Sequence, residues 1–362
     1  MIVRSLRLRN FRNYENAEVH FDPGMNVLTG MNAQGKTNIL ESLVYLSLTR
    51  SHRISDDRKL IRHDAPFADI KCVFTDERDK EIEAVIHPKG KTLFVYHQPV
   101  KKSSEFIGLL NVILFAPDDL RIFNDQPRDR RRMMNQEITK VSVEYLLSLN
   151  RFQNFLKERN LLLKQQRIDD IYLRILDEQM SEAEEYIIRE RKEFIDMINL
   201  HIGKFYYALS SENADLKVVY KCALEEDISK QNLIRKHEES RKKDLEYRVT
   251  NFGIHHEDIL FMMNDRNLVQ TASQGQKRMA LLAFKLSLMK YIEAKTRKKP
   301  VLLLDDVLSE LDTEKQKRLL KLVSEPYQCL ITATELPEFI RHIPMKQFRV
   351  ENGSITEITG GI

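Results

Sequence analysis

A glycine-rich segment near the N-terminus reads Gly30-Met31-Asn32-Ala33-Gln34-Gly35-Lys36-Thr37. It matches the phosphate-binding pattern G-x-x-x-x-G-K-[ST] at every specified position. An apolar run, Met25–Thr29, precedes the segment, and apolar residues at helical spacing follow it from Ile39 to Leu48. Strand, loop and helix in this order are what a phosphate-binding loop requires. The segment therefore predicts an α/β nucleotide-binding domain.

The residues of this loop have distinct expected roles. Gly30 and Gly35 let backbone N–H groups close around phosphates at a helix N-terminus. We expect Lys36 to neutralise the β- and γ-phosphates and the Thr37 hydroxyl to be a ligand of Mg²⁺. A glycine-rich turn without a ligand is the alternative, and the strand and helix around the loop disfavour it. ATP and Mg²⁺ are the predicted cofactors.

A second apolar run near the C-terminus ends in two carboxylates. Val301–Leu304 is followed by Asp305 and Asp306, a pattern typical of a buried parallel strand that leads into a nucleotide site. We expect Asp305 to hold the water shell of Mg²⁺, and Asp306 to orient or deprotonate the attacking water. Alternatively, Asp306 caps the segment that follows it. Together with Lys36, these two residues are the catalytic candidates.

A second anion site is predicted where Ser273-Gln274-Gly275-Gln276 opens a helical pattern. Serine and glycine at a helix N-terminus favour an anion. Because the P-loop already surrounds the phosphates of its own chain, this helix is best explained if it faces the nucleotide of another copy. An ordinary capped helix is the simpler alternative. We therefore expect Ser273, Gly275 and Gln276 to complete the ATP site of a partner in a homodimer.

Composition limits the possible classes of protein. The 362 residues are 42% hydrophobic and carry a formal net charge of +4, so any nucleic-acid surface must be a local patch. Cys72, Cys222 and Cys329 are far apart and lack metal-ligand spacing, which predicts reduced thiols and no structural zinc. No segment resembles a signal peptide or the roughly 18 apolar residues of a membrane span. We expect a soluble, cytoplasmic protein with no membrane partner.

The periodicity changes along the chain. From Asp118 to about Leu200 the pattern is helical and heavily charged, whereas strand-like runs dominate before and after this region. Asn352-Gly353, between two short apolar runs, predicts a terminal hairpin. We expect one α/β head, built from residues 1–116 and 256–362, with a mainly helical domain inserted at 117–255.

Four segments together resemble the ABC-type ATPases. In chain order, the P-loop, the Ser273 segment, the Asp305 strand and Ser309-Glu310-Leu311-Asp312 resemble the P-loop, signature, Walker B and D-loop of that class. Asn32 and Asn38, in G-x-N-x-x-G-K-T-N, narrow the resemblance to the SMC and RecF branch. Further landmarks make the chain similar to the RecF family along essentially its full length: Leu8–Tyr14, Arg50–Arg53, Leu60–Arg62, Phe115–Leu120, Arg130–Arg132, Gly253 and His255.

The resemblance implies a fold and a function. The fold is an ABC-type P-loop ATPase head, a mixed sheet with flanking helices, that carries the inserted helical domain. Asn32 and Asn38 join the residues expected at the nucleotide. The implied function is ATP-dependent dimerisation around gapped or single-strand/double-strand junction DNA, in recombinational repair linked to DNA replication, DNA damage and the SOS response. RecR and RecO are the implied protein partners.

Slow turnover is expected at this site. Asp306 stands where many relatives carry glutamate, and a side chain one methylene shorter lies farther from the attacking water. A weak, DNA-stimulated ATPase that releases DNA on hydrolysis is therefore the expected activity.

Two arginine clusters are the candidates for DNA contact, because arginines can follow a phosphate backbone. For any single arginine, a solvated charged face is the simpler explanation. No stacking-aromatic motif is nearby, so we expect no base-specific recognition. The first cluster contains Arg50, Arg53 and Arg58, and the second contains Arg128, Arg130, Arg131 and Arg132.

The chain departs from the family pattern at several places. Gly253–Asp258 reads Gly-Ile-His-His-Glu-Asp, where proline and arginine are expected after the glycine and histidine. Neither the Gln-Gly of a Q-loop nor a switch histidine after Cys329–Thr332 is found, which leaves Thr332 or Thr334 for the γ-phosphate. His255–Asp258 suggests a metal site, but a structural role is favoured because adjacent histidines point different ways.

Three other functions stay open at this point. A subunit that drives another complex, such as a transporter ATPase, is disfavoured by the missing Q-loop. A small-molecule kinase needs an acceptor pocket and no signature helix. A head that binds nucleotide without significant turnover is compatible with Asp306.

Overall fold

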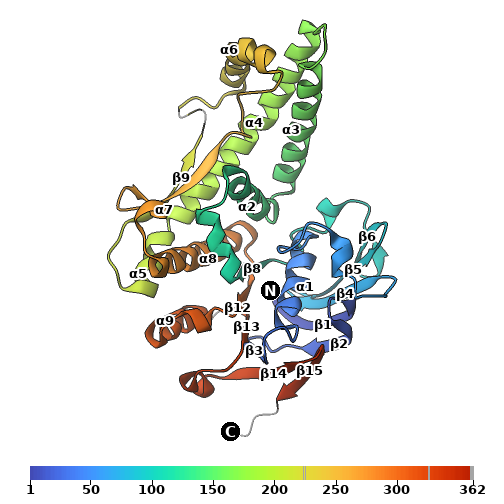
Figure 1. Ribbon diagram of the computed structural model, residues 1–362, viewed down its shortest axis with the longest axis vertical. Helices are drawn as coiled ribbons and strands as arrows, with labels where there is room; N and C mark the ends of the chain where they lie inside the picture. The colour runs from blue at the N-terminus through green and yellow to red at the C-terminus, as the bar shows by residue number, and fades with distance from the viewer. Residues whose placement is uncertain (223, 225, 325–326, 359–362) are drawn as a thin grey trace. The chain divides into compact units, whose positions relative to one another are not determined.

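The structure is a computed structural model that describes residues 1–222, 224, 226–324 and 327–358 (Figure 1). The chain divides into two compact units. The first comprises Met1–Leu120, Lys204–Glu212 and Leu281–Ile362, and the second comprises Arg121–Gly203 and Asn213–Ala280. Among the described residues, no helix combines the length and the apolar character needed to span a membrane.

A six-stranded sheet in the first unit has the order β15-β14-β3-β13-β12-β8. All neighbouring strands are parallel except the terminal pair β14 and β15. The inner strands are continuous apolar runs because both faces of the sheet are covered. The strands are β3 (Met25–Thr29), β8 (Val112–Phe115), β12 (Val301–Asp305), β13 (Cys329–Ala333), β14 (Met345–Glu351) and β15 (Ser354–Ile358).

The pairing register explains how distant motifs meet. Leu28 of β3 pairs with Thr332 of β13, which pairs on its other side with Asp305 of β12. Parallel strands end at the same edge of a sheet, so the P-loop after β3 and the carboxylates at the end of β12 lie at one edge. The prediction of a buried parallel strand at Val301–Leu304 is confirmed.

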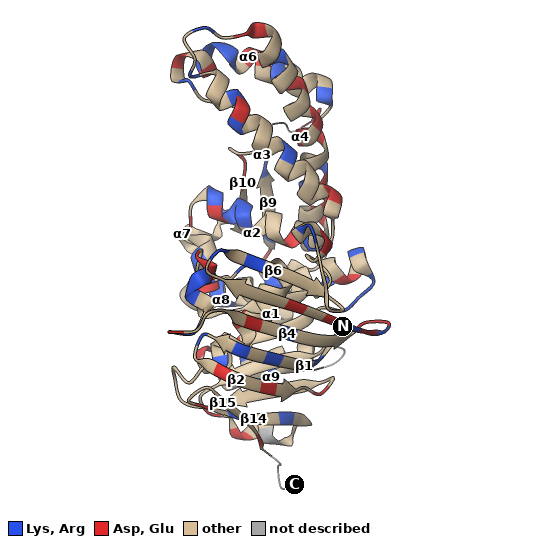
Figure 2. Ribbon diagram, turned by 90° about the vertical axis from the view of Figure 1, so that its right-hand side faces the viewer, with Lys and Arg blue, Asp and Glu red and all other residues tan. Residues whose placement is uncertain are grey.

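The second sheet of this unit is antiparallel, with the order β2-β1-β4-β5-β6-β7. Buried and exposed residues alternate along its strands, as expected when one face packs on a core. Figure 2 shows basic residues spaced along β1, and the three arginines of this strand, Arg4, Arg7 and Arg9, are exposed. The strands are β1 (Ile2–Phe11), β2 (Tyr14–His20), β4 (Ala68–Thr75), β5 (Asp79–His87), β6 (Gly90–Val95) and β7 (Gln98–Pro99).

Helix α1 (Lys36–Leu48) contacts strands of both sheets, among them β4, β8 and β12. Eleven of its thirteen residues are buried, which explains why its sequence lacks a polar face. Among the buried residues is one carboxylate, Glu41, with no exposed surface. The helix begins after Gly35 and ends at Leu48, and the capping residue Thr49 has a left-handed φ of 55°.

The second unit combines helices with a small sheet. Helices α3 and α4 run side by side as a hairpin (Figure 1), and the sheet has the order β11-β10-β9. Buried ion pairs join the helices: Arg159 of α3 lies 2.7 Å from Asp177 and 2.8 Å from Asp244. The elements are α2 (Pro127–Thr139), α3 (Val143–Leu162), α4 (Asp170–Asn199), β9 (Leu216–Lys221), α6 (Lys230–Tyr247), β10 (Asp258–Met263), β11 (Arg266–Asn267) and α7 (Leu268–Thr271).

The compact units differ from the expected boundaries in three ways. Residues 117–120, expected in the inserted domain, group with the first unit. The expectation assigned residues 256–280 to the head, but they group with the second unit because β10 pairs with β9 over six residues. Residues 204–212 group with the first unit. Helix α8 (Gln274–Thr296) contributes residues to both units. The remaining elements are α5 (Ile202–Ser210), α9 (Thr313–Val323) and the 3-10 helices Asp57–Leu60, Ser103–Glu105, Pro117–Phe123, Leu308–Glu310 and Glu338–His342.

Candidate nucleotide-binding site

Two glycines of the P-loop cannot be replaced without displacing their surroundings. Gly30 has a φ of +154°, and a Cβ there would lie 2.3 Å from the carbonyl oxygen of Val350 in β14. Gly35 has a φ of +114°, and a Cβ there would lie 2.6 Å from Nδ2 of Asn13. Glycine is required at both positions by backbone conformation and by close approach.

The N-terminus of α1 is open to an anion. Gly35 precedes the helix, no side chain caps it, and the first turn holds no acidic residue. The first N–H groups of the helix are therefore available for phosphate oxygens. Lys36 Nζ donates to the carbonyl oxygens of Gly30 (2.6 Å) and Met31 (2.9 Å), which closes the loop around its own side chain. Burial lowers the pKa of Lys36, while Asp306 and Asp305 raise it.

The two predicted metal-site residues meet directly. Thr37 Oγ1 donates to Oδ1 of Asp305 at 2.9 Å. Thr332 Oγ1 donates to the same oxygen at 2.7 Å, so the buried carboxylate is fixed from two sides. Hydroxyl and carboxylate oxygens are the ligand types that Mg²⁺ prefers. This donor set fits the ion that the sequence predicts.

Asp306 is held in an unusual conformation and does not act as a cap. Its φ is 51°, a left-handed value that is uncommon for residues other than glycine. Its N–H donates to Thr332 Oγ1 at 2.9 Å, and its Oδ1 is buried without a hydrogen-bond partner among the described residues. The next helical turn follows Val307 and has no side-chain cap. One carboxylate oxygen of Asp306 is therefore left without a hydrogen bond at the edge that carries Asp305 and Thr37.

The signature segment forms a reciprocal cap in the second unit. The N–H of Gln276 donates to Ser273 Oγ at 3.2 Å, and the N–H of Ser273 donates to Gln276 Oε1 at 3.0 Å. This is the capping-box arrangement, which agrees with the simpler alternative of a capped helix. However, Ser273 and Gly275 are both exposed, and the Ser273 hydroxyl proton is not used by the cap.

The P-loop is supported by side chains that the sequence did not assign to the site. Asn13, in the turn between β1 and β2, donates from Nδ2 to the Gln34 carbonyl oxygen at 2.8 Å, and the Tyr14 hydroxyl donates to that of Gly35 at 3.0 Å. The Asn352 N–H, in the predicted hairpin turn, donates to Gln34 Oε1 at 2.6 Å. In the sequence, Asn13 and Tyr14 stand out only as part of a family landmark, because their contacts depend on folding.

The two asparagines that narrowed the resemblance lie differently. Asn32 is exposed in the loop. Asn38 is half-buried: its Nδ2 donates to Asn13 Oδ1 at 2.8 Å, and its Oδ1 accepts from Arg53 at 3.2 Å. The side chain of Asn38 thus connects the P-loop support to the first arginine cluster.

The first arginine cluster lies in the segment after α1. Arg50 is half-buried, and Arg53 and Arg58 are exposed. Arg58 pairs with Asp56 through Nε at 2.9 Å and NH2 at 2.8 Å. Hydrogen bonds from Arg58 lower the pKa of Asp56 to about 2.

The second cluster, on α2, is divided between two environments. Arg130 donates from Nε and NH2 to the carboxylate of Asp258 at 2.8 and 2.6 Å, and Arg131 donates to the carbonyl oxygen of Glu257. Arg128 and Arg132, one helical turn apart, are exposed. Arg130 and Arg131 are therefore half-buried and hold the start of β10, whereas Arg128 and Arg132 are exposed.

The Gly253–Asp258 segment has a structural role. The buried carboxylate of Glu257 accepts from Arg191 at 2.7 Å and from the hydroxyl of Tyr220. His255 and His256 donate from Nε2 to the same carbonyl oxygen, that of Thr250, at 3.1 and 3.2 Å. Burial lowers the pKa of His255 to about 4, so it is neutral at pH 7.

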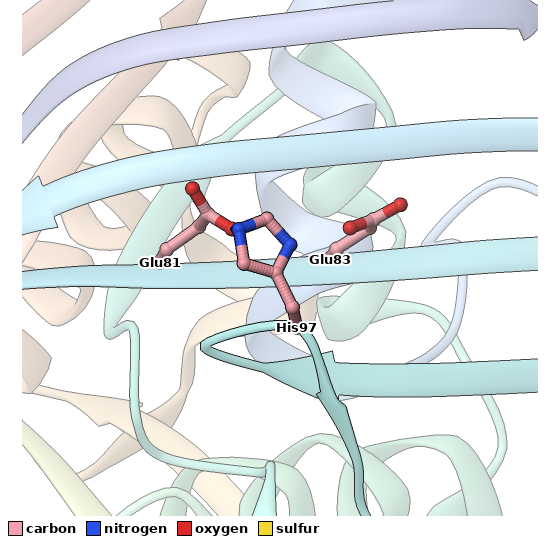
Figure 3. Close-up of side chains that lie close together, drawn as sticks. All are labelled: Glu81, Glu83 and His97. Carbon is pink, nitrogen blue, oxygen red and sulfur yellow. The ribbon is translucent and has the colours of Figure 1, made fainter.

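Within the described residues, one group of metal-type side chains gathers away from the P-loop. Glu81 and Glu83 of β5 and His97, between β6 and β7, lie together on the antiparallel sheet (Figure 3). The imidazole lies between the two carboxylates, 3.0 Å from Glu81, which also pairs with Lys71 at 2.8 Å. Two of its three members already pair with each other, so we assign no metal to it.

Comparison with known proteins places these features in one family. The model of the RecF/RecN/SMC N terminal domain matches residues 2–353. The DNA replication and repair protein RecF of Ligilactobacillus salivarius is 38% identical over 370 residues, covering 99% of this chain and 98% of that protein. That of Clostridium novyi is 37% identical over 365 residues, covering 99% and 100%.

Solved structures agree with the sequence comparison. A structure of the recombination mediator protein RecF with ATP in the RecFOR pathway is 30% identical and has a TM-score of 0.90, covering 99% of this chain and 98% of that one. An Smc head domain of Pyrococcus furiosus shares the fold at 16% identity with a TM-score of 0.59, covering 99% and 96%. From the full-length match to its relatives, we conclude that this chain belongs to the RecF family.

Proposed function

We propose that this chain is an ATP-dependent DNA-binding protein of recombinational repair, which dimerises on ATP and releases DNA on slow hydrolysis. One observation carries the proposal: Thr37, Asp305 and Asp306 converge beside the uncapped N-terminus of α1. Membership of the RecF family, one member of which is solved with ATP, supports the same assignment.

Nucleotide binding follows from the geometry of the P-loop. The N–H groups that begin α1 receive the phosphates, and Lys36 exchanges its two carbonyl partners for phosphate oxygens. Thr37 and Asp305 would hold Mg²⁺, which neutralises phosphate charge when bound. Thr332 keeps the Asp305 carboxylate in the orientation that this requires.

Hydrolysis is assigned to Asp306. Its carboxylate oxygen Oδ1 has no partner among the described residues and is therefore available to accept a proton from the attacking water. This observation favours turnover over a head that only binds nucleotide. The short side chain supports a slow, DNA-stimulated rate.

The dimer completes the site with the signature helix. The exposed Ser273 hydroxyl and the Gly275 backbone at the start of α8 offer donors to the γ-phosphate of a second copy. ATP then shifts the population toward the closed dimer, because only that state uses both sets of donors. A small-molecule kinase has no need of this second helix.

The DNA and protein partners are proposed from the family. Gapped or junction DNA is the proposed ligand, contacted by exposed arginines of both clusters, and RecR and RecO are the proposed partners. We expect the protein to act in the cytoplasm. Arg130 and Arg131 are less suitable for phosphate contact than Arg128 and Arg132, because they already hold β10.

Sedimentation of wild type and Ser273→Arg with ATP, Mg²⁺ and a gapped duplex tests the proposal. We expect wild type to dimerise and bind the duplex, and Ser273→Arg to bind ATP but stay monomeric. Gln166→Arg, at an exposed bend of the same unit, controls for the added charge. If wild type stays monomeric under every condition, the shared site is wrong and the kinase or passive-head function must be considered again.

A further inference from the structure

A basic segment follows α1 directly. Residues 50–62, here called the basic loop, contain five basic side chains against two acidic ones. Two of the three arginines of the first cluster are exposed on it, and Glu41 of α1 is the fully buried carboxylate near its base. Nothing in the proposed chemistry uses Glu41.

Glu41 holds the start of the basic loop. Its carboxylate accepts from the hydroxyl of Ser51, and NH1 of Arg53 lies 3.7 Å from Oε2. The oxygen of that Ser51 hydroxyl in turn accepts the N–H groups of Arg53 at 3.0 Å and Ile54 at 3.2 Å. The first turn of the loop is therefore built on one buried carboxylate.

Arg12 connects Glu41 to the end of the basic loop. It donates to both oxygens of Glu41, from Nε at 2.9 Å and from NH2 at 2.7 Å. Its NH1 donates to the carbonyl oxygen of Lys59 at 3.3 Å, and its backbone N–H donates to that of Leu60 at 2.7 Å. Both ends of the basic loop thus depend on the same ion pair.

The same group of side chains reaches the P-loop. Glu41 lies one helical turn after Thr37, so it moves with the start of α1. A second route runs from Arg53 to Asn38, from Asn38 to Asn13, and from Asn13 to the carbonyl oxygen of Gln34 in the P-loop, with contacts of 3.2, 2.8 and 2.8 Å. A shift of the P-loop around phosphates is therefore transmitted to the basic loop by direct contacts.

We propose that Glu41 is a positioning residue that couples nucleotide occupancy of the P-loop to the position of the basic loop, so that ATP and DNA bind with linked affinities. The DNA half of this inference rests on the proposed function. Linkage of this kind is reciprocal: if ATP strengthens DNA binding, DNA strengthens ATP binding by the same factor.

The charge of Glu41 is what the coupling requires. Burial alone raises its pKa, but hydrogen bonds from Arg12 and Ser51 and the charges of Arg12 and Arg53 outweigh burial and lower it. The carboxylate is therefore ionised at neutral pH. Glu41→Gln keeps the size of the side chain but leaves Arg12 and Arg53 without a counter-charge, so the loop loses its anchor while α1 keeps its packing.

The test is hydrogen–deuterium exchange of residues 50–62 with and without ATP and Mg²⁺, in a Ser273→Arg background that removes any contribution from dimerisation. With Glu41 intact, we expect ATP to slow exchange in the basic loop of this monomeric background. In protein that keeps Ser273 and can dimerise, we expect ATP to tighten binding of a gapped duplex on the order of tenfold. With Glu41→Gln, we expect ATP to bind but both responses to disappear. Asp69→Asn, another buried carboxylate paired with an arginine in this unit, serves as the matched control and should keep both responses.

The possible outcomes separate the inference from the proposed function. If Glu41→Gln keeps the ATP-dependent protection of the loop, the inference is wrong. If the duplex does not bind to any form, the DNA function fails, and the exchange data still decide the role of Glu41. If Glu41→Gln does not fold, Ser51→Ala replaces it: a reduced response supports the inference, and an unchanged response contradicts it.

Discussion

The two arginine clusters look alike in the sequence but differ in the structure. In the cluster on α2, Arg130 and Arg131 face inward and bind Asp258 and the Glu257 backbone. In the cluster after α1, Arg53 is exposed and reaches the buried Glu41 only at 3.7 Å. Arginine-rich sequence therefore indicates a charged region, whereas burial and partners decide which guanidinium groups can reach a phosphate.

The largest expected effect is on the stability of the second unit. Arg130→Ala leaves the mostly buried Asp258 carboxylate unpaired, so the free energy of unfolding should fall by about 3 kcal/mol. Arg132→Ala, two positions away and exposed, should change it by less than about 0.5 kcal/mol. Urea denaturation measures both. Equal losses for the two variants would show that Arg130 and Arg132 do not differ in their structural role.

The next largest effect is the loss of stability expected when Glu41, the buried carboxylate that holds the arginine cluster after α1, is replaced. Glu41→Gln should lower the free energy of unfolding by about 2 kcal/mol at pH 7, because Glu41 accepts charge-assisted hydrogen bonds. The folded-state pKa of Glu41 lies below its ordinary value of 4.5, so its contribution is complete above pH 4.5 and is lost as pH falls through the folded-state value. Urea denaturation of both forms between pH 7 and pH 3 should show the difference shrinking. A difference that stays constant contradicts this account.

Duplex binding distinguishes the two faces of α2. Replacing both Arg128 and Arg132 with alanine should weaken binding of a gapped duplex and reduce the salt slope by about one unit for each arginine. Salt titrations of binding, followed by fluorescence anisotropy, measure the slope. Thermal unfolding checks that both proteins are folded. An unchanged slope would exclude this face of α2 from the DNA surface.

The smallest effect is expected at Arg58. Its ion pair with Asp56 is exposed, and exposed pairs contribute little to stability. Arg58→Ala should leave Tm unchanged and reduce the salt slope less than Arg53→Ala does, because Asp56 already neutralises part of the Arg58 charge. The opposite order of the two variants would identify Arg58 as the stronger phosphate contact in the basic loop.

Local patterns predicted the core of the site. The P-loop, the strand that ends at Asp305 and the Asn352-Gly353 turn each depend on a short run of sequence, and the structure confirms all three elements. The support of the P-loop by Asn13 was not predicted, because that contact requires the β1–β2 turn to fold against a loop 21 residues later. Similarly, pairing of β10 with the distant β9 determines which unit contains residues 256–280.

The position of β3 in its sheet has a consequence for protein synthesis. This strand leads into the P-loop, yet its two neighbours, β13 and β14, begin at Cys329 and Met345. At about 5–20 residues per second, the ribosome needs on the order of 15–60 seconds after making β3 before either neighbour exists. The nascent chain therefore cannot pair the strand that carries its nucleotide loop until about 300 further residues have been made, and a chain that stops before Cys329 never can.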